Sequence, residues 1–203
     1  MPRRSDPPGA QFAGLVNRRI DDVRYFEPHI ADLPEPRWGA GVFDALDFGL
    51  EIDLDDATTW SFIWYQAGTI ETLLAYPGTL AAQLGPDADP AVWDVTDRWR
   101  TLGPASIASV QDVRGRHSGA DVDHTRGHGD HPGEPEDDLV TLILTSPSQD
   151  IAIITLGDCD SDGAFHYSHD TVAVFFSLEE ARKTRMLLPG HPDAIVQTVE
   201  RGA

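Results

Sequence analysis

Alternation of apolar and polar residues is the clearest pattern in this chain. Apolar side chains recur at every second position from Phe48 through Leu50 and Ile52 to Leu54. A period of two directs one set of side chains into a core and the other set into water. The pattern therefore predicts a β-strand over residues 47–54 with one buried face.

The opposite face of this strand is acidic. Asp47, Glu51 and Asp53 alternate with the apolar residues, so we expect their carboxylates to be exposed on one side of a sheet. Charges on one side of a strand add rather than cancel, and they can select and steer a basic protein. These residues are the first candidates for a partner-binding site. Replacing Glu51 with alanine is then expected to change the free energy of unfolding by no more than about 0.5 kcal/mol.

Two hairpins are predicted, one in each half of the chain. In the first, residues 47–54 precede an Asp-Asp-Ala-Thr turn and an alternating run over 59–65. In the second, apolar runs over 139–145 and 150–156 flank a Ser-Pro-Ser-Gln turn. Alternation bounded by turn-forming residues is typical of antiparallel hairpins.

The two halves share further features that suggest an internal repeat. Each hairpin is followed by another apolar run, at 69–76 and at 171–176, and preceded by three apolar residues with the same spacing. These preceding residues are Leu15, Ile20 and Val23 in the first half, and Leu102, Ile107 and Val110 in the second. We interpret this as two copies of a strand–loop–hairpin–strand unit, roughly 90 residues apart. Generic β patterning is the alternative.

The predicted fold class is α+β, predominantly antiparallel β, with two similar strand–hairpin–strand units and a C-terminal helix. Residues 1–11 are expected to form a flexible tail, 12–100 a first β-rich unit and 101–203 a second. A single integrated domain is the alternative. Residues 114–138 combine Gly, His, Asp and Pro with few apolar residues, which predicts a mobile loop.

Few helices are expected. Ser177 and Glu180 form a capping box, which predicts a helix over Leu178–Leu188. Shorter helical turns are predicted near 80–84 and 91–94.

The charge balance narrows the classes of partner. The chain has 34 Asp and Glu against 15 Lys and Arg, a net charge of −19. This charge repels nucleic-acid phosphates and anionic lipid, and it favours a basic protein partner. We therefore expect a non-catalytic, acidic binding protein, such as an immunity or inhibitor protein that opposes a cationic toxin. Solubility alone is the competing explanation of the charge.

The location of the protein is predicted from what the sequence lacks. No apolar segment follows the N-terminus as in a signal peptide, and the longest apolar runs are too short to span a bilayer. A single cysteine, Cys159, excludes an intramolecular disulfide. We expect a cytoplasmic protein.

One segment resembles a calcium-binding loop. Residues 158–163 follow the D-x-D-x-D-G spacing of an EF-hand loop, in which alternate carboxylates converge on the ion. The expected ligands are Asp158, Asp160 and Asp162 with the carbonyl of Ala164. The position of the bidentate glutamate is taken by His169, and the predicted flanks are strands. The alternative function is thus a calcium-binding domain, or a metal-dependent enzyme that uses residues 158–170. The competing interpretation of this segment is an acidic loop between two strands that binds no ligand.

Other chemistry is less well supported by the sequence. Histidines crowd one segment at His117, His124, His128 and His131, but no metal-binding frame supports a site there. The acidic neighbours of Cys159 would raise its pKa and oppose catalysis by the thiol. No catalytic residue and no cofactor other than calcium is predicted.

Two tryptophans complete the candidate partner-binding residues. Trp93 and Trp99 stand among Asp94, Asp97, Arg98 and Arg100. Aromatic and arginine residues together are typical of interface anchors. Packing between the two halves is their alternative role.

Overall fold

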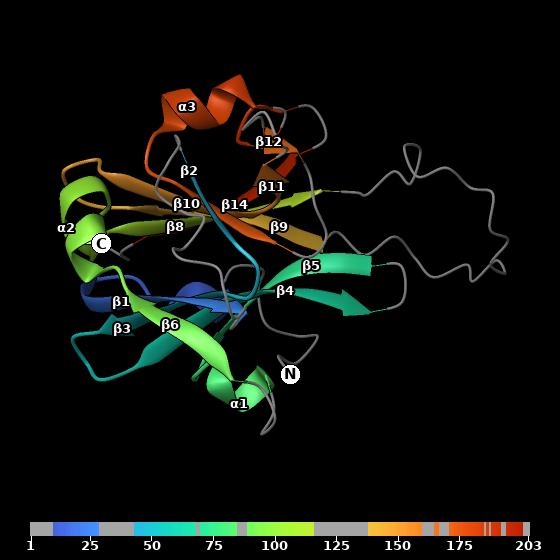
Figure 1. The fold of residues 1–203 in the computed structure, drawn as a ribbon. Coiled ribbons are helices and arrows are strands. Elements are labelled where there is room, and N and C mark those ends of the chain that lie inside the picture. Colours follow the sequence, from blue (N-terminus) through green and yellow to red (C-terminus); the bar gives the residue numbers. More distant parts are fainter. Residues whose placement is uncertain are drawn as a thin grey trace, which may run out of the picture.

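The computed structural model of this chain describes residues 10–28, 43–67, 70–84, 89–115, 138–159, 165–166, 171–184, 186, 188–191 and 194–200. Within these ranges the protein is mostly antiparallel β-sheet with few helices, as predicted. Figure 1 shows two sheets stacked one above the other, with α2 beside one end of the stack. None of the helices described is long and apolar enough to cross a bilayer.

The first sheet contains the first predicted hairpin. Its strands follow the order β5 (Ile70–Pro77), β4 (Thr59–Ala67), β3 (Gly49–Leu54), β1 (Arg18–Pro28) and β6 (Pro90–Asp94), while the short β7 (Ser106–Ile107) also pairs with β1. A 3-10 turn, η1 (Ala10–Phe12), precedes β1. All pairs are antiparallel, and β3 and β4 form the expected hairpin. The strand β6 is the edge of this sheet.

The second sheet contains the second predicted hairpin, β9 with β10. Its order is β14 (Ala194–Glu200), β8 (Ser109–Gly115), β9 (Asp138–Thr145), β10 (Ile151–Leu156), β13 (Val172–Phe175) and β2 (Phe43–Leu46). A separate two-stranded ribbon pairs β11 (Asp158–Cys159) with β12 (Phe165–His166). In sequence β2 belongs to the first half, yet it pairs with β13 at the edge of the second sheet. The two predicted units are therefore interlocked.

A continuous hydrophobic core fills the space between the sheets. The predicted inward residues Leu50, Ile52 and Leu54 are buried in it, whereas Phe48 precedes β3 and is half-buried. Residues from both halves contribute, including Val23 and Leu142. A smaller apolar cluster lies on the other face of the second sheet and includes residues of α3 (Leu178–Lys183).

The helices differ from prediction in length and place. The Ser177 hydroxyl accepts a hydrogen bond from the Glu180 N–H at 3.3 Å, as a capping residue should, but α3 ends at Lys183. The strand β14 follows it, so the structure does not confirm a C-terminal helix. The turn predicted near 80–84 is α1 (Ala81–Leu84). The one predicted near 91–94 is wrong, because these residues pair with β1 as β6.

The alignment proposed between the two halves is not confirmed. Leu15 is buried in the turn before β1, whereas Leu102 ends α2 (Thr96–Leu102) with 42% of its surface exposed. Ile20 lies in β1 and Ile107 in the short β7. Only Val23 and Val110 are both fully buried in long strands.

Several predicted segments lie outside the described residues. These are 1–9 of the tail and 116–137 of the predicted loop. The prediction is wrong at both ends of that loop, because Arg114 and Gly115 belong to β8 and Asp138 begins β9.

Candidate functional site

The acidic face predicted on β3 is covered by another segment. Glu51 is only 3% exposed, which contradicts its predicted exposure. The chain after β5 folds back over the outer face of the first sheet, where the Leu80 N–H donates to the Glu51 carboxylate. The Ser61 hydroxyl donates to the Gly78 carbonyl at 2.7 Å and fixes the same segment. Strand alternation identified the two faces correctly but did not reveal that both are covered.

An arginine from the neighbouring strand compensates the charge of this face. Arg24 in β1 forms ion pairs with Glu51 at 2.8 Å and with Asp53 at 2.6 Å. Hydrogen bonding to Asp53 raises the pKa of Arg24 further above its usual range. Burial alone would raise the pKa of Asp53, but hydrogen bonds from Arg24 and Thr59 outweigh it and lower the pKa. Two of the three predicted carboxylates, those of Glu51 and Asp53, thus form ion pairs within the protein.

The third predicted carboxylate, Asp47, lies just before β3 and is half-buried. Its N–H donates to the Glu27 carboxylate at 3.0 Å, and its carbonyl accepts from the Trp64 indole at 2.8 Å. The three acidic residues therefore do not form the open face that the sequence predicts.

Trp99 is buried rather than exposed as an interface anchor. It is 1% exposed, and its indole N–H donates to the Tyr25 hydroxyl at 2.9 Å. That hydroxyl donates to the buried carboxylate of Asp44 at 2.9 Å. Arg98 donates to both oxygens of Asp44, at 2.9 and 2.7 Å. This network joins β1 and α2 to β2, which pairs with β13 in the second sheet. Trp99 also packs against Phe176 from the second half of the chain, which is consistent with its alternative role in packing between the halves.

The buried network has little capacity for acid–base chemistry. Burial, and then the nearby Asp44 carboxylate, raise the pKa of Tyr25 well above its usual value. The phenol therefore stays protonated at neutral pH and acts as a hydrogen-bond donor. The Asp44 carboxylate is fully buried, so the arrangement serves to hold the elements together.

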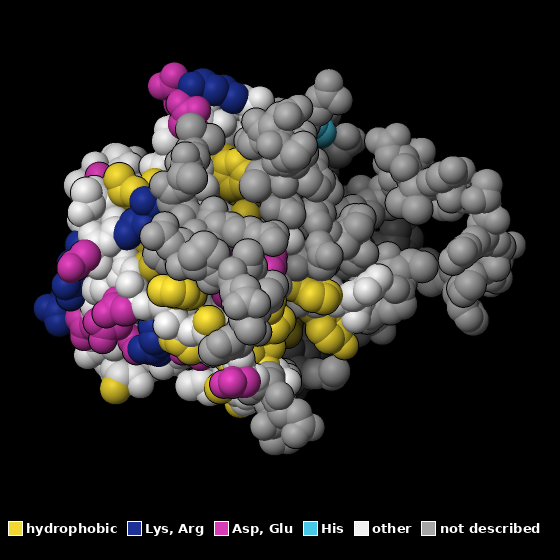
Figure 2. Space-filling model, in the orientation of Figure 1, with side chains coloured by type: hydrophobic (Ala, Val, Ile, Leu, Met, Phe, Trp, Pro, Cys, Tyr) yellow, Lys and Arg dark blue, Asp and Glu magenta, His cyan; other side chains and the backbone are white. Residues whose placement is uncertain are grey.

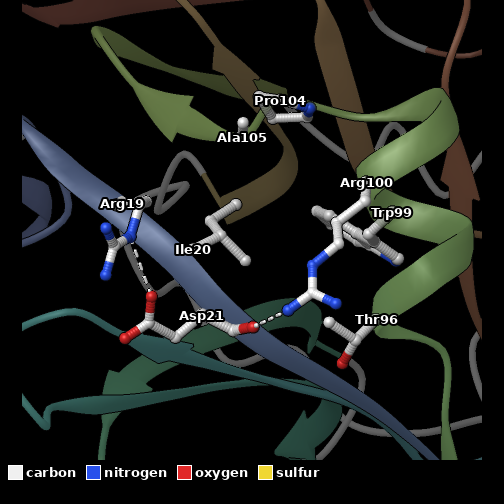
Figure 3. Close-up of a pocket in the computed structure, with 8 residues that line it drawn as sticks. All are labelled: Arg19, Ile20, Asp21, Thr96, Trp99, Arg100, Pro104 and Ala105. Carbon is white, nitrogen blue, oxygen red and sulfur yellow. Dashed lines mark hydrogen bonds and ion pairs between the residues drawn. The ribbon is translucent and has the colours of Figure 1, made fainter.

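Two cavities that share Thr96 and Arg100 lie between β1 and α2, and we refer to them together as the groove. The first cavity has a volume of about 340 Å³ and is shown in Figure 3. Its lining residues are Arg19, Ile20, Asp21, Thr96, Trp99, Arg100, Pro104 and Ala105. Arg100 spans the groove from α2, donating to the Asp21 carbonyl at 3.3 Å and to the Asp97 carboxylate at 3.1 Å. Ile20 lies between the Arg19–Asp21 ion pair and α2 (Figure 3).

The second cavity, also about 340 Å³, is lined by more carboxylates. Its lining residues are Asp22, Asp94, Val95, Thr96, Asp97, Arg98 and Arg100. Asp94 accepts a hydrogen bond from the Thr96 N–H at 2.9 Å, which holds the start of α2. Hydrogen bonding to Thr96 lowers the pKa of Asp94, so this carboxylate is ionised at neutral pH.

Beside this cavity, β6 exposes large apolar side chains at the edge of the sheet. Val92 is 50% exposed and Trp93 is 38% exposed. Exposed carboxylates lie at both ends of the strand, Asp89 before it and Asp94 at its last position. We name the β6 surface as Asp22, Asp89, Val92, Trp93, Asp94 and Asp97. Of the five partner-binding residues predicted from sequence, it contains Trp93.

Charges of both signs surround this region. Figure 2 shows acidic and basic side chains side by side over α2, β1 and β6, rather than a uniformly acidic face. Asp97 pairs with Arg100 in an exposed ion pair, whereas Arg98 and Arg24 are engaged by Asp44, Glu51 and Asp53. Asp22 and Asp89 have no ion-pair partner within the described part of the chain.

The predicted metal sites fall largely outside the described residues. Asp158 and Cys159 pair with Phe165 and His166 as a short ribbon, while Asp160, Asp162, Ala164 and His169 are not described. The predicted histidine cluster is also outside. Among the described residues, no group of three or more His, Cys, Asp or Glu side chains could hold a metal ion. Calcium binding stays a prediction.

Comparison with known proteins gives no match to a family model, a curated protein or a solved structure.

Replacing Glu51 with alanine should destabilise the protein. The change removes a buried partner of Arg24, so we expect a loss of about 3 kcal/mol in the free energy of unfolding, the low end for a broken buried pair because Asp53 remains. Asp55→Ala, at an exposed turn position, is the control and should leave stability nearly unchanged. Denaturant titration measures both; equal stabilities would show that Glu51 is not a buried partner.

Millimolar calcium should leave the melting temperature unchanged. His169 cannot supply the bidentate carboxylate that completes such a loop, and only a ligand that binds the folded state raises the melting temperature. Thermal unfolding with calcium, magnesium or chelator checks this. A saturable rise with calcium that the double change Asp160→Asn and Asp162→Asn abolishes would contradict it.

Proposed function

We propose that this is a non-catalytic binding protein of the cytoplasm, whose β6 surface recognises a basic protein partner. An immunity or inhibitor protein that opposes a cationic toxin is an example of this class. One observation carries the proposal: Val92 and Trp93 are exposed at a sheet edge between carboxylates at both of its ends. Exposed apolar residues supply contact area at an interface, and carboxylates beside them favour a partner with complementary positive charge.

The local charges support a basic partner. Asp22 and Asp89 are exposed and have no ion-pair partner among the described residues, and Asp94 is ionised. Arg24 and Arg98 form their ion pairs with Glu51, Asp53 and Asp44, and Arg100 forms its ion pair with Asp97, so none of the three forms an ion pair with Asp22 or Asp89. The field of the whole chain, with its charge of −19, has the same sign. Such a field attracts cationic proteins and repels nucleic acid.

The strand orders of the two sheets support a second proposal, that the protein arose by duplication. In each sheet a four-strand meander, β1-β3-β4-β5 or β8-β9-β10-β13, is followed by a helix and a strand that returns beside the first. The hairpin turns also correspond: Ala57 and Gln149 have φ of 64° and 73°, and each N–H bonds the carbonyl three residues earlier. In this alignment β6 corresponds to β14.

Neutralising the β6 surface should slow partner association. We expect the double change Asp22→Asn with Asp89→Asn to lower the association rate several-fold at low salt, because steering by surface charge raises such rates by about 10-fold or more. The difference should shrink as salt rises, because the Debye length falls to about 8 Å at physiological ionic strength. The partner is first isolated from the cell extract at low salt, and rates are then measured by surface plasmon resonance.

A matched variant separates local from total charge. Glu179→Gln with Glu200→Gln changes the net charge equally at exposed positions on α3 and β14. This control should retain most of the wild-type association rate. If all three proteins associate with the partner at equal rates, the charge serves only solubility. If both variants associate equally slowly, the total charge steers the partner and the β6 surface is not the binding site.

A further inference from the structure

The strand β6 ends the first sheet with one side of its backbone unpaired by any described strand. Edge strands of this kind can pair with another chain, so proteins either shield them or use them for binding. We infer that β6 binds an extended, basic segment of the partner as an added β-strand. This inference rests on the proposed function and specifies how the β6 surface would contact its partner.

The pairing register shows which backbone groups are available. The Val95 N–H donates to the Val23 carbonyl at 3.0 Å, and the next pair along is Arg24 with Asp94. In an antiparallel ladder, hydrogen-bonded pairs alternate with pairs whose N–H and C=O groups point away from each other. Trp93 therefore faces β1 with its backbone groups. The N–H and C=O groups of Val92 and Asp94 point outward, and no described segment bonds to them.

The outward groups are two donors and two acceptors at alternate residues, which is the pattern that an added strand pairs with. Pro90 begins β6 and has no N–H to offer, so pairing would start at Val92. Side chains alternate between the faces of the sheet. The partner strand would therefore contact Val92 and Asp94 on one face and Trp93 on the other.

Charge decides what kind of strand fits. Asp89 and Asp94 flank the exposed apolar residues, and Asp22 lies with Asp94 beside the second cavity. A segment with lysine or arginine next to apolar residues would satisfy both features. A second copy of this chain would bring like charges together at the same edge, which opposes pairing between copies.

A proline change tests the inference. Val92→Pro removes an outward N–H and fills its place with the ring, but it removes no bond to β1, and proline is tolerated where the N–H side of an edge strand faces solvent. Val92→Thr keeps the N–H and a β-branched side chain, and serves as the matched control. The probe is a short capped peptide of alternating lysine and valine, together with the same peptide N-methylated at every residue.

We expect the unmethylated peptide to bind wild type and Val92→Thr with similar affinity. Val92→Pro should bind it about tenfold more weakly, as expected from the loss of one main-chain hydrogen bond at a crowded edge. The methylated peptide keeps the charge but cannot donate main-chain bonds, so wild type should bind it at least as weakly. Hydrogen exchange at the amides of Val92 and Asp94 should slow on addition of the unmethylated peptide.

Three results would contradict the addition of a partner strand to β6. Strand addition would be overturned if a folded Val92→Pro variant bound the unmethylated peptide as tightly as wild type does. It would also be overturned if wild type bound the methylated peptide as tightly as the unmethylated one. If Val92→Pro does not fold, the comparison of the two peptides on wild type is the test. Self-association of wild type that Val92→Pro abolishes would identify a second copy as the occupant and also overturn it. If strand addition is overturned but association with the basic partner still depends on the charges of the β6 surface, the proposed function stands. If that charge-dependent association is also absent, the proposed function is wrong as well.

Discussion

A carboxylate buried between two sheets destabilises a protein unless its charge is compensated, and Asp44 is in this position. Arg98 binds both of its oxygens, and the Tyr25 hydroxyl donates to one of them. The three residues come from β2, α2 and β1, so satisfying one charge fixes three elements. It also holds β2, a strand from the first half of the chain, at the edge of the second sheet.

The candidate surface depends on the same contact. Only Val95 separates β6 from α2, and Arg98 lies in the first turns of that helix. Holding Arg98 on Asp44 therefore sets where Asp97 and Arg100 lie, and with them the groove beside β1. Trp99 strengthens the contact by donating to Tyr25 and packing edge-on against Phe176 at 5.3 Å between ring centroids. A buried polar network thus positions an exposed acidic edge.

Local pattern was sufficient to predict the two hairpins and the buried face of β3, because these depend on a period of two and on turn residues. It was insufficient where a distant segment decides the outcome. The alternation predicts an exposed Glu51, but the chain around Leu80 covers it. The neighbouring charges predict that Trp99 is an interface anchor, but it is buried and bonds Tyr25 from a distant strand. The sequence around 91–94 predicts a helical turn rather than a strand, because the pairing partner of these residues lies more than 60 residues away in β1. Asp22 and Asp94 also come together on the β6 surface through the pairing of β1 with β6, which the local sequence does not reveal. Trp93 is the one residue of the β6 surface that the sequence predicts to contact a partner.

The most direct test of this account is a double-mutant cycle between Asp44 and Arg98. The free energy of unfolding is measured by denaturant titration for wild type, Asp44→Asn, Arg98→Gln and the double variant. Because each group compensates the other in a buried site, we predict a coupling energy of about 1–3 kcal/mol, with the double variant losing clearly less than the sum of the single losses. Losses that add to within about 0.5 kcal/mol would show that the two residues act independently, and would contradict the central place given to the Asp44 network.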